Sequence, residues 1–330
     1  MNENTTFVTA GRPRFDYLPV SFFGAVMGLT GLSVAWRLAA VRYGVPEWIA
    51  GSLGTVAVIV FLALCIGYGL KIASAWGAVQ AEFRHPIAGN LFGTILISLL
   101  LLPIVLKGTS LLAARVLWIL GAAGMVVFAL LIVNRWMSNR QQLLHATPTW
   151  IVPVVGLLDL PLALPGLELP PMHGLAMFAL AVGLFFTIPL FTIIFSRLLF
   201  EDPMPDALRP SLMILVAPFA VGYSAYTTVT GQVDHFAEAL YMLTLFMLAV
   251  SLNQIRHLAS CCPFRVSWWA ISFPLAASAI AALRFAASRP SGFSDVIACV
   301  VLALATLIVG ALLGRTLIGL VRGELRTLSG

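Results

Sequence analysis

Charged residues are scarce in this sequence of 330 residues, at only 10%. Soluble globular domains carry about 25% Asp, Glu, Lys and Arg. Hydrophobic residues instead make up 60% of the chain, and its mean hydropathy is +1.00. These values exclude a soluble globular domain and predict an all-α polytopic membrane protein.

Motifs of enzymes, metal sites and nucleic-acid binding are also missing. The five histidines show no HExxH spacing and no triad order, and the four cysteines lack the paired spacing of a metal site. The formal charge is +6, but the basic residues are scattered singly between apolar runs, whereas a nucleic-acid surface needs a basic patch. We therefore expect no enzymatic activity, no cofactor, no metal and no nucleic-acid partner.

Few ionisable residues lie inside the apolar runs. They include Asp159 in an interrupted run, Arg37 and Arg284 near run ends, and Asp234 and Glu238 near the start of another run. Transporters driven by protons or sodium usually keep titratable groups inside their spans. The scarcity argues against tight ion coupling and favours a passive or weakly coupled path.

Ten apolar runs are long enough to cross a membrane. The fifth is short and is interrupted by Asp159, Pro161 and Pro165. The predicted spans are 18–40, 48–72, 87–106, 111–133, 150–165, 172–195, 211–230, 236–255, 266–287 and 293–321. The chain thus divides into an N-terminal segment (1–17), a transmembrane domain (18–321) and a C-terminal tail (322–330).

Orientation follows from the Lys and Arg residues, which concentrate on the cytoplasmic side of membrane proteins. Thirteen of the 19 fall on the side of the termini. The polar N-terminus does not resemble a cleaved signal peptide. We expect a multi-pass protein of a bacterial inner membrane with both termini cytoplasmic.

Prolines recur at or near the start of each odd-numbered span. They are Pro19, Pro86, Pro148 with Pro153, Pro210 with Pro218, and Pro274, at a mean interval of about 64 residues. A proline inside a membrane helix frees a carbonyl that needs a partner or a water-lined cavity. One interpretation is ordinary kinked helices; the repeat favours five helical hairpins, with the five odd helices around a central axis.

Phe273 directly precedes Pro274, so a distorted backbone can aim its ring at that axis. The simpler interpretation is that Phe273 is one of 21 phenylalanines that pack between helices. An apolar constriction can nevertheless gate a pore. Arg284, about three turns further on, either concentrates anions at the mouth or extends to the membrane interface as a topology residue.

Five segments resemble the tellurite-resistance and C4-dicarboxylate transporter family, which includes bacterial TehA proteins and plant guard-cell slow anion channels. They are LPVSFFGAVMGL from Leu18, EFRHP from Glu82, PTWIVPVVG from Pro148, RPSLMILVAPFAVGYSAY from Arg209 and SWWAISFPLA from Ser267. All five odd spans are covered, and the last motif is the most specific. Leu157, after Gly156, departs from relatives that often carry a polar residue there.

The resemblance implies ten helices in five hairpins around a quasi-fivefold central pore, and a homotrimer with one pore in each subunit. It implies a gate at Phe273, followed by Pro274. The pore-lining positions that it implies are Phe23, Gly24, Phe92, Gly156 and Ala217, to which the kink signals add Gly28, Gly93 and Pro274.

The sequence therefore predicts an anion channel, or a channel-like transporter, that passes small monovalent anions or oxyanions through a neutral pore. Its partners would be these anions and membrane lipid. The alternative is a proton-coupled secondary transporter of C4-dicarboxylates or tellurite. A membrane scaffold without transport activity would require the lumen to be filled by bulky side chains.

Overall fold

A computed structural model of the chain describes residues 16–258 and 262–329. The described residues form helices and no strand, and ten of the helical segments are long and apolar enough to span a membrane. They are Val20–Tyr43, Trp48–Ser74, Ala88–Leu106, Leu111–Ser138, Pro148–Gly166, His173–Phe200, Asp206–Thr230, His235–Ile255, Val266–Ser288 and Gly292–Val321. The ten predicted spans are confirmed.

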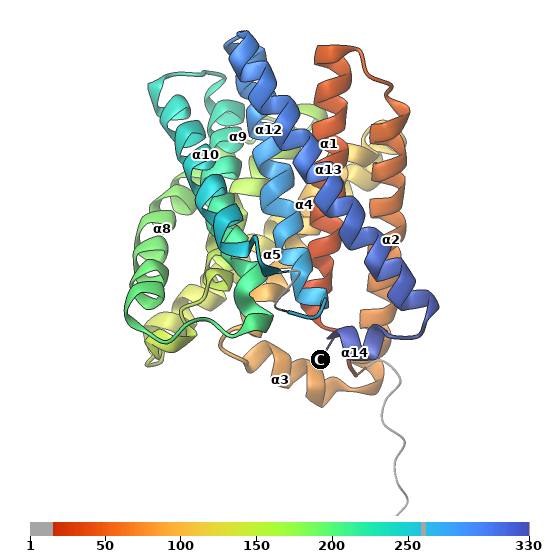
Figure 1. The fold of residues 1–330 in the computed structure, drawn as a ribbon, viewed down its shortest axis with the longest axis vertical. Coiled ribbons are helices and arrows are strands. Elements are labelled where there is room, and N and C mark those ends of the chain that lie inside the picture. The colour runs from red at the N-terminus through yellow and green to blue at the C-terminus, as the bar shows by residue number, and fades with distance from the viewer. Residues whose placement is uncertain (1–15, 259–261, 330) are drawn as a thin grey trace, which may run out of the picture.

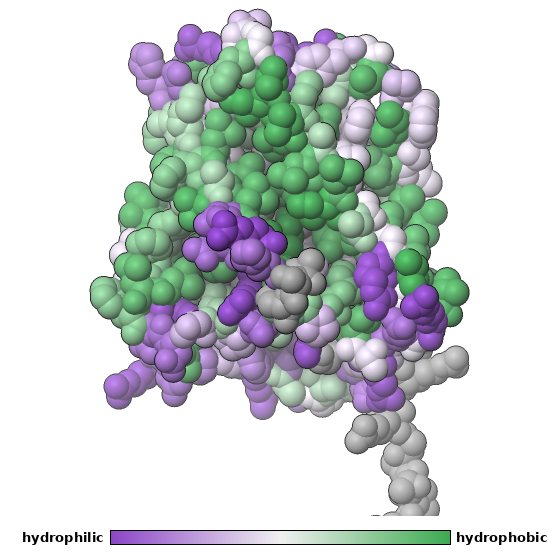
Figure 2. Space-filling model, viewed as in Figure 1, coloured by the Kyte–Doolittle hydropathy of each residue, from purple (hydrophilic) through white to green (hydrophobic). Residues whose placement is uncertain are grey.

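The odd-numbered spans form the interior of the bundle. Between 56% and 78% of the residues in an 18-residue apolar stretch of each odd span are buried, against 28% to 39% in the even spans. The outer helices α2 (Trp48–Ser74), α5 (Leu111–Ser138), α8 (His173–Phe200), α10 (His235–Ile255) and α13 (Gly292–Val321) are each continuous. Figure 2 shows a hydrophobic band between more hydrophilic upper and lower ends, as a bilayer requires.

Each inner span begins with a 3₁₀ segment and then continues as α-helix. The pairs are η1 (Val20–Phe23) with α1 (Gly24–Tyr43), η2 (Ala88–Phe92) with α4 (Gly93–Leu106), η4 (Pro148–Ile151) with α6 (Val152–Val155), η7 (Asp206–Val216) with α9 (Ala217–Thr230), and η8 (Val266–Ile271) with α12 (Ser272–Ser288). The fifth span also has η5 (Gly156–Asp159), α7 (Leu160–Ala163) and η6 (Leu164–Gly166). Most prolines of these spans lie in or next to the irregular segments, because they cannot donate a backbone hydrogen bond, whereas Pro103 lies inside α4.

Three outer helices begin with side-chain caps instead. Ser110 accepts a hydrogen bond from the backbone of Ala113 at the start of α5, and Asp234 accepts two at the start of α10. Ser291 and Ser294 form a capping box at the start of α13. These caps satisfy backbone donors at the helix start and allow regular α-helix from the first turn.

The inner helices contact one another in sequence order. α1 contacts α4, α4 contacts α7, α7 contacts α9, α9 contacts α12, and α12 returns to α1. Each inner segment also contacts the outer helix that follows it, as α1 does with α2 and α12 with α13. Figure 1 shows α12 in the interior, with α13 crossing in front of it.

The connection between the second and third spans is itself helical. It holds a separate helix, α3 (Trp76–Arg84), which lies across the lower end of the bundle in Figure 1. Glu82 of α3 accepts hydrogen bonds from Lys71 Nζ at 2.7 Å and from the backbone N–H of Val20 at 2.7 Å. Lys71 Nζ also donates to the carbonyl of Leu18 at 2.7 Å, so α3 is tied to the start of the first span.

Both described ends of the chain lie on one side of the bundle. Arg326, in α14 (Leu325–Ser329), donates to a carboxylate oxygen of Asp16 at 3.0 Å. Residues 1–15 of the predicted N-terminal segment 1–17 lie outside the described residues. The predicted tail 322–330 contains the short helix α14 within its described residues 322–329.

Candidate functional site: two cavities along the inner helices

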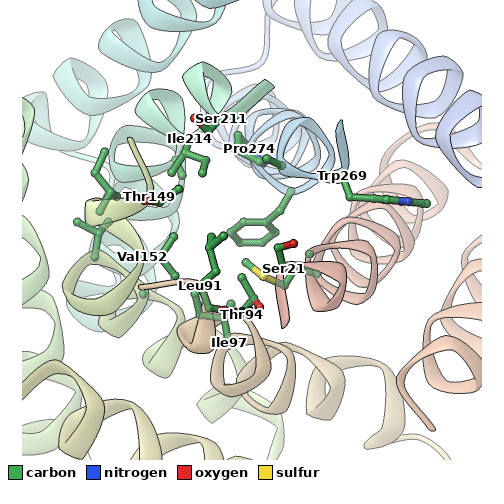
Figure 3. Close-up of a pocket in the computed structure, with 18 of the residues that line it drawn as sticks. Ser21, Leu91, Thr94, Ile97, Thr149, Val152, Ser211, Ile214, Trp269 and Pro274 are labelled. Carbon is green, nitrogen blue, oxygen red and sulfur yellow. Dashed lines mark hydrogen bonds between the residues drawn. The ribbon is translucent and has the colours of Figure 1, made fainter. Parts of the chain in front are cut away.

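A cavity of about 110 Å³, here called the wide cavity, lies where the inner spans begin. All five inner spans contribute to its wall, and Figure 3 shows Ser21, Leu91, Val152, Ile214 and Pro274 around one central space. Most of the lining is aliphatic. The wide cavity therefore lies on the side of the termini and is enclosed by elements far apart in the sequence.

Hydroxyl groups line the wide cavity, one from each inner span. They are Ser21, Thr94, Thr149, Ser211 and Ser267, and the first four are labelled in Figure 3. The Oγ of Ser267 is buried and has no hydrogen-bond partner among the described residues. A hydroxyl can donate one hydrogen bond and accept two, so this set adds neutral polar groups to an apolar wall.

A second, narrow cavity of about 30 Å³ lies further along the same helices. Its wall includes Thr30 of α1, Leu101 of α4, Leu162 of α7 and Ser224 of α9, together with residues of α12. All five inner spans again take part. The narrow cavity thus continues the wide one toward the side of the bundle opposite the termini.

Phe273 and Val221 line both cavities. Phe273 lies in the first turn of α12 and is 7% exposed, and Val221 is on α9 and 3% exposed. The Phe273 ring lies against α1, since a methyl group at Gly31 would be 3.6 Å from its Cδ2. These two side chains are the wall that the wide and narrow cavities share.

Arg284 lies at the other end of the narrow cavity. It also lines an open pocket of about 710 Å³, the far-side pocket, together with Leu38, Val41 and Ser288. Its Nη1 donates to the hydroxyl of Thr228 at 2.9 Å and to the carbonyl of Ser224 at 3.2 Å. The guanidinium is therefore held between the narrow cavity and the far-side pocket.

Five of the predicted pore residues are brought together at the wide cavity. Gly24, Gly156, Ala217, Phe273 and Pro274 all line it. α1 and α9 begin at Gly24 and Ala217, so the starts of two helices meet at this wall.

Four other predicted pore residues lie elsewhere. The ring of Phe23 packs edge-on against Phe61 and Tyr68, away from the wide cavity lining, and Phe92 lines a groove beside α3. A methyl group at Gly28 would be 2.1 Å from Ser272 Oγ, so Gly28 is a helix-packing position. At Gly93 it would meet Val152 at 2.9 Å.

Sequence reasoning did not select Asp159 or the hydroxyl groups as lining residues. Asp159 is 2% exposed and lines the wide cavity. A signal for the hydroxyls was present: Ser21, Thr149 and Ser211 each follow a proline by one or two residues. A Ser or Thr just after a proline at the start of a span places a short polar side chain where the backbone turns.

The described residues contain no group of three or more His, Cys, Asp or Glu that could hold a metal ion. Among the described lining residues of the wide cavity, Asp159 is the one carboxylate and there is no Lys, Arg or His. The wall therefore offers hydroxyls, one buried acid and apolar side chains. This set suits binding and passage of a small solute better than bond-making chemistry.

Comparisons with known proteins place the chain in a family. A protein-family model described as "SLAC1: Voltage-dependent anion channel" matches residues 17–317. The S-type anion channel SLAH3 of Arabidopsis thaliana is 32% identical over 311 residues, which cover 91% of this chain and 48% of that protein. The S-type anion channel SLAH2 of the same plant is 28% identical over 309 residues, covering 90% of this chain and 58% of that protein.

The alignment with a bacterial relative covers more of that relative's length than the alignments with the two plant channels do. The tellurite resistance protein TehA homolog of Haemophilus influenzae is 27% identical over 273 residues, which are 81% of each chain. The chain spans only about half the length of the two plant relatives. With its ten apolar spans it is a multi-pass membrane protein. Because the match over residues 17–317 takes in most of the chain, the chain belongs to the SLAC1 family, a family of anion channels and transporters and not of enzymes.

Proposed function

We propose that this chain passes small monovalent anions or oxyanions across the membrane through a neutral pore, with Phe273 as its gate. The path runs from the wide cavity through the narrow cavity to the far-side pocket. The observation that carries the proposal is that Phe273 and Val221 line both cavities. Moving one aromatic ring would join the two spaces.

The wall of this path suits weak binding of anions. The hydroxyl of Ser267 is buried without a partner among the described residues, so it can donate a hydrogen bond without a fixed positive charge, whereas Thr94 and Ser211 already donate to the carbonyls of Leu91 and Leu208. A fixed cation inside the pore would bind an anion too tightly to release it. The described lining of the wide cavity has no such cation, so dehydration becomes the selective step there, which favours weakly hydrated anions.

Arg284 supplies positive charge at the mouth instead of inside the wide cavity. Its position between the narrow cavity and the far-side pocket suits the recruitment of anions from the far-side solution. Its bonds to Ser224 and Thr228 hold it at this level of the bundle. These contacts favour the recruiting role over extension to the membrane interface.

The test is anion current through the purified protein in planar bilayers, for wild type and Phe273→Ala. Phe285→Ala is the matched control, because Phe285 is on the same helix and is also 7% exposed, but stacks on Tyr241 with ring centroids 4.1 Å apart. We expect Phe273→Ala to raise the current several-fold and Phe285→Ala to leave it unchanged. Equal currents for all three proteins would contradict the assignment of Phe273 as the gate.

Reversal potentials measured with chloride, nitrate and malate on one side would rank the anions. A neutral lumen predicts that nitrate permeates better than chloride, because nitrate is less strongly hydrated. The same order should hold in Phe273→Ala, since the substitution removes an obstruction and leaves the hydroxyl lining in place. A current carried by cations would contradict the proposal itself.

The alternative function is proton-coupled transport of a C4-dicarboxylate or tellurite. One observation favours it: Asp159 places a buried carboxylate in the wall of the wide cavity. Uphill uptake of malate or tellurite into proteoliposomes, driven by a pH gradient alone, would establish this activity. Uptake that only follows the substrate gradient would support the channel.

We further propose a homotrimer in a bacterial inner membrane, with both termini in the cytoplasm. The trimer rests on the family resemblance, and many apolar side chains of the outer helices, such as Phe185, Phe246 and Leu307, are exposed to lipid or to a neighbouring subunit. Mass measured by light scattering in detergent tests the oligomer. Labelling of a cysteine introduced near Arg326 in intact cells tests the orientation.

A further inference from the structure

Asp159 is the last residue of the 3₁₀ segment η5, three residues after Gly156. Positions i and i+3 of a 3₁₀ helix lie on the same side, so Gly156 and Asp159 both line the wide cavity. Asp159 is 2% exposed, and its Oδ1 is buried without a hydrogen-bond partner among the described residues. A buried acid thus faces the proposed anion path with one oxygen unpaired.

No basic group compensates this carboxylate within the part of the chain that the structure describes. The other lining residues of the wide cavity carry no charge. Of the elements that pack on η5, α4, α6, α7 and α9 contain no Asp, Glu, Lys, Arg or His. The elements that do carry such residues are α5, with Arg115 and Arg135, and α8, with His173 and Arg197.

These four residues lie near helix ends. Arg115 donates to the carbonyl of Leu167, and Arg135 donates to the carbonyl of Phe83. α8 packs on η5 near Gly183, and Arg197 lies 14 residues beyond it, about 21 Å along the helix at 1.5 Å per residue. His173 is at the opposite end of α8.

The remaining titratable groups on these elements are two tyrosines of α9, both engaged elsewhere. The Tyr223 ring packs against Tyr241 and Phe285, and the Tyr226 hydroxyl donates to Asp234 at 2.6 Å. The environment of Asp159 is therefore apolar apart from neutral hydroxyls. An ionised carboxylate without a partner is costly in such a place, whereas the neutral acid is tolerated and its O–H can donate.

We propose that Asp159 binds a proton together with the anion in the wide cavity, so that protonation of this one side chain controls anion passage. The proton comes from the aqueous phase on the side of the termini. The neutral acid donates its O–H to the anion, whereas the ionised carboxylate repels the anion. The two binding events are then linked, each strengthening the other. This inference rests on the proposed anion path and adds its regulation.

The first experiment measures anion current at fixed voltage, with nitrate as the anion and the pH on the side of the termini varied from about 8 to about 5. Wild-type current should rise as the pH falls, by up to about tenfold per pH unit above the midpoint, because one proton is titrated. Asp159→Asn, which is neutral and can donate, should carry a high current that does not change with pH. Asp202→Asn, at an exposed loop position, is the control and should keep the wild-type profile.

A wild-type current that is independent of pH would overturn the inference, and so would an unchanged pH profile in Asp159→Asn. Asp159→Glu covers the case in which the asparagine variant does not fold: it keeps a titratable group and should shift the midpoint. If neither wild type nor Phe273→Ala carries anion current at any pH, the proposed function fails instead.

A second measurement does not depend on current. Infrared difference spectra of the wild-type protein in detergent, with and without nitrate at constant pH, should show a growing carbonyl band from a protonated carboxylic acid. The band should be absent in Asp159→Asn and present in Asp202→Asn. A wild-type spectrum without this band would show that nitrate does not bring a proton to Asp159, and the inference would be wrong.

Discussion

Gly28 of α1 lies directly against Ser272 of α12. A methyl group at Gly28 would be 2.1 Å from Ser272 Oγ and 2.3 Å from its Cβ. The Ser272 hydroxyl donates to the carbonyl of Trp269 at 2.7 Å and lies 3.2 Å from that of Gly24. This close approach brings α1 and α12 together on the side of α12 next to Phe273.

We therefore expect Gly28→Ala to destabilise the protein by about 1–3 kcal/mol, because the added methyl group must push the two helices apart. The measurement is thermal unfolding in detergent followed by tryptophan fluorescence. Gly310→Ala on α13 is the control, since nothing lies within 4 Å of that position. Equal unfolding temperatures for the two variants would contradict the packing role of Gly28.

This contact also shows what the sequence could not resolve. Gly24 and Gly28 are one turn apart on α1, yet Gly24 lines the wide cavity and Gly28 packs on Ser272. In the pair Phe23–Gly24, consecutive residues point in different directions, and only Gly24 lines the wide cavity. Whether a position lines a cavity depends on how the neighbouring helix packs against it, and the sequence of one segment does not contain this information.

The spans themselves were predictable because their length and hydropathy are local properties. The start of the second span at Trp48 and the ends of the third and seventh at Leu106 and Thr230 agree with the prediction. The helix α3 was not predicted, because its one inward polar side chain, Glu82, has its partner Lys71 on another helix. The position of Asp159 in the cavity wall was also not predicted, because the wide cavity forms only where all five inner spans come together.

The Lys71–Glu82 ion pair predicts a large effect from removing one partner. Its side chains are 4% and 13% exposed, and the charges lie 2.7 Å apart. Lys71→Met should cost about 3–5 kcal/mol in the free energy of unfolding, because Glu82 would remain largely buried without its cation. Unfolding in detergent at increasing denaturant concentration measures the loss.

The double variant Lys71→Met with Glu82→Gln should be more stable than Lys71→Met alone, because no uncompensated charge remains. Glu168→Gln provides the exposed control: its pair with Arg115 has side chains that are 77% and 33% exposed, and its loss should cost less than about 1 kcal/mol. A loss for Lys71→Met as small as that of Glu168→Gln would show that the ion pair does not hold α3.

Val221, like Phe273, lines both cavities and provides a graded test of the gate. Val221→Ala should raise anion current, but less than Phe273→Ala does, since only two methyl groups leave the shared wall. Val221→Phe should lower it. Val154→Ala is the matched control, because Val154 is equally buried but does not line either cavity. If the current does not depend on the size of residue 221, the constriction lies elsewhere along the path.

Arg284 should act through its charge, and ionic strength separates this from a packing role. In Arg284→Gln we expect a smaller anion current in dilute salt, because the far-side pocket no longer concentrates anions. Raising the salt to about 1 M shortens the screening length to about 3 Å. The currents of wild type and Arg284→Gln should then become equal. Arg284→Lys keeps the positive charge and should retain most of the current. A lysine cannot reproduce the geometry of the hydrogen bond from Nη1 to Thr228, so this variant separates the effect of the charge from that of the bond. If lysine and glutamine lower the current equally at every salt concentration, Arg284 acts by holding α9 against α12 and not by attracting anions.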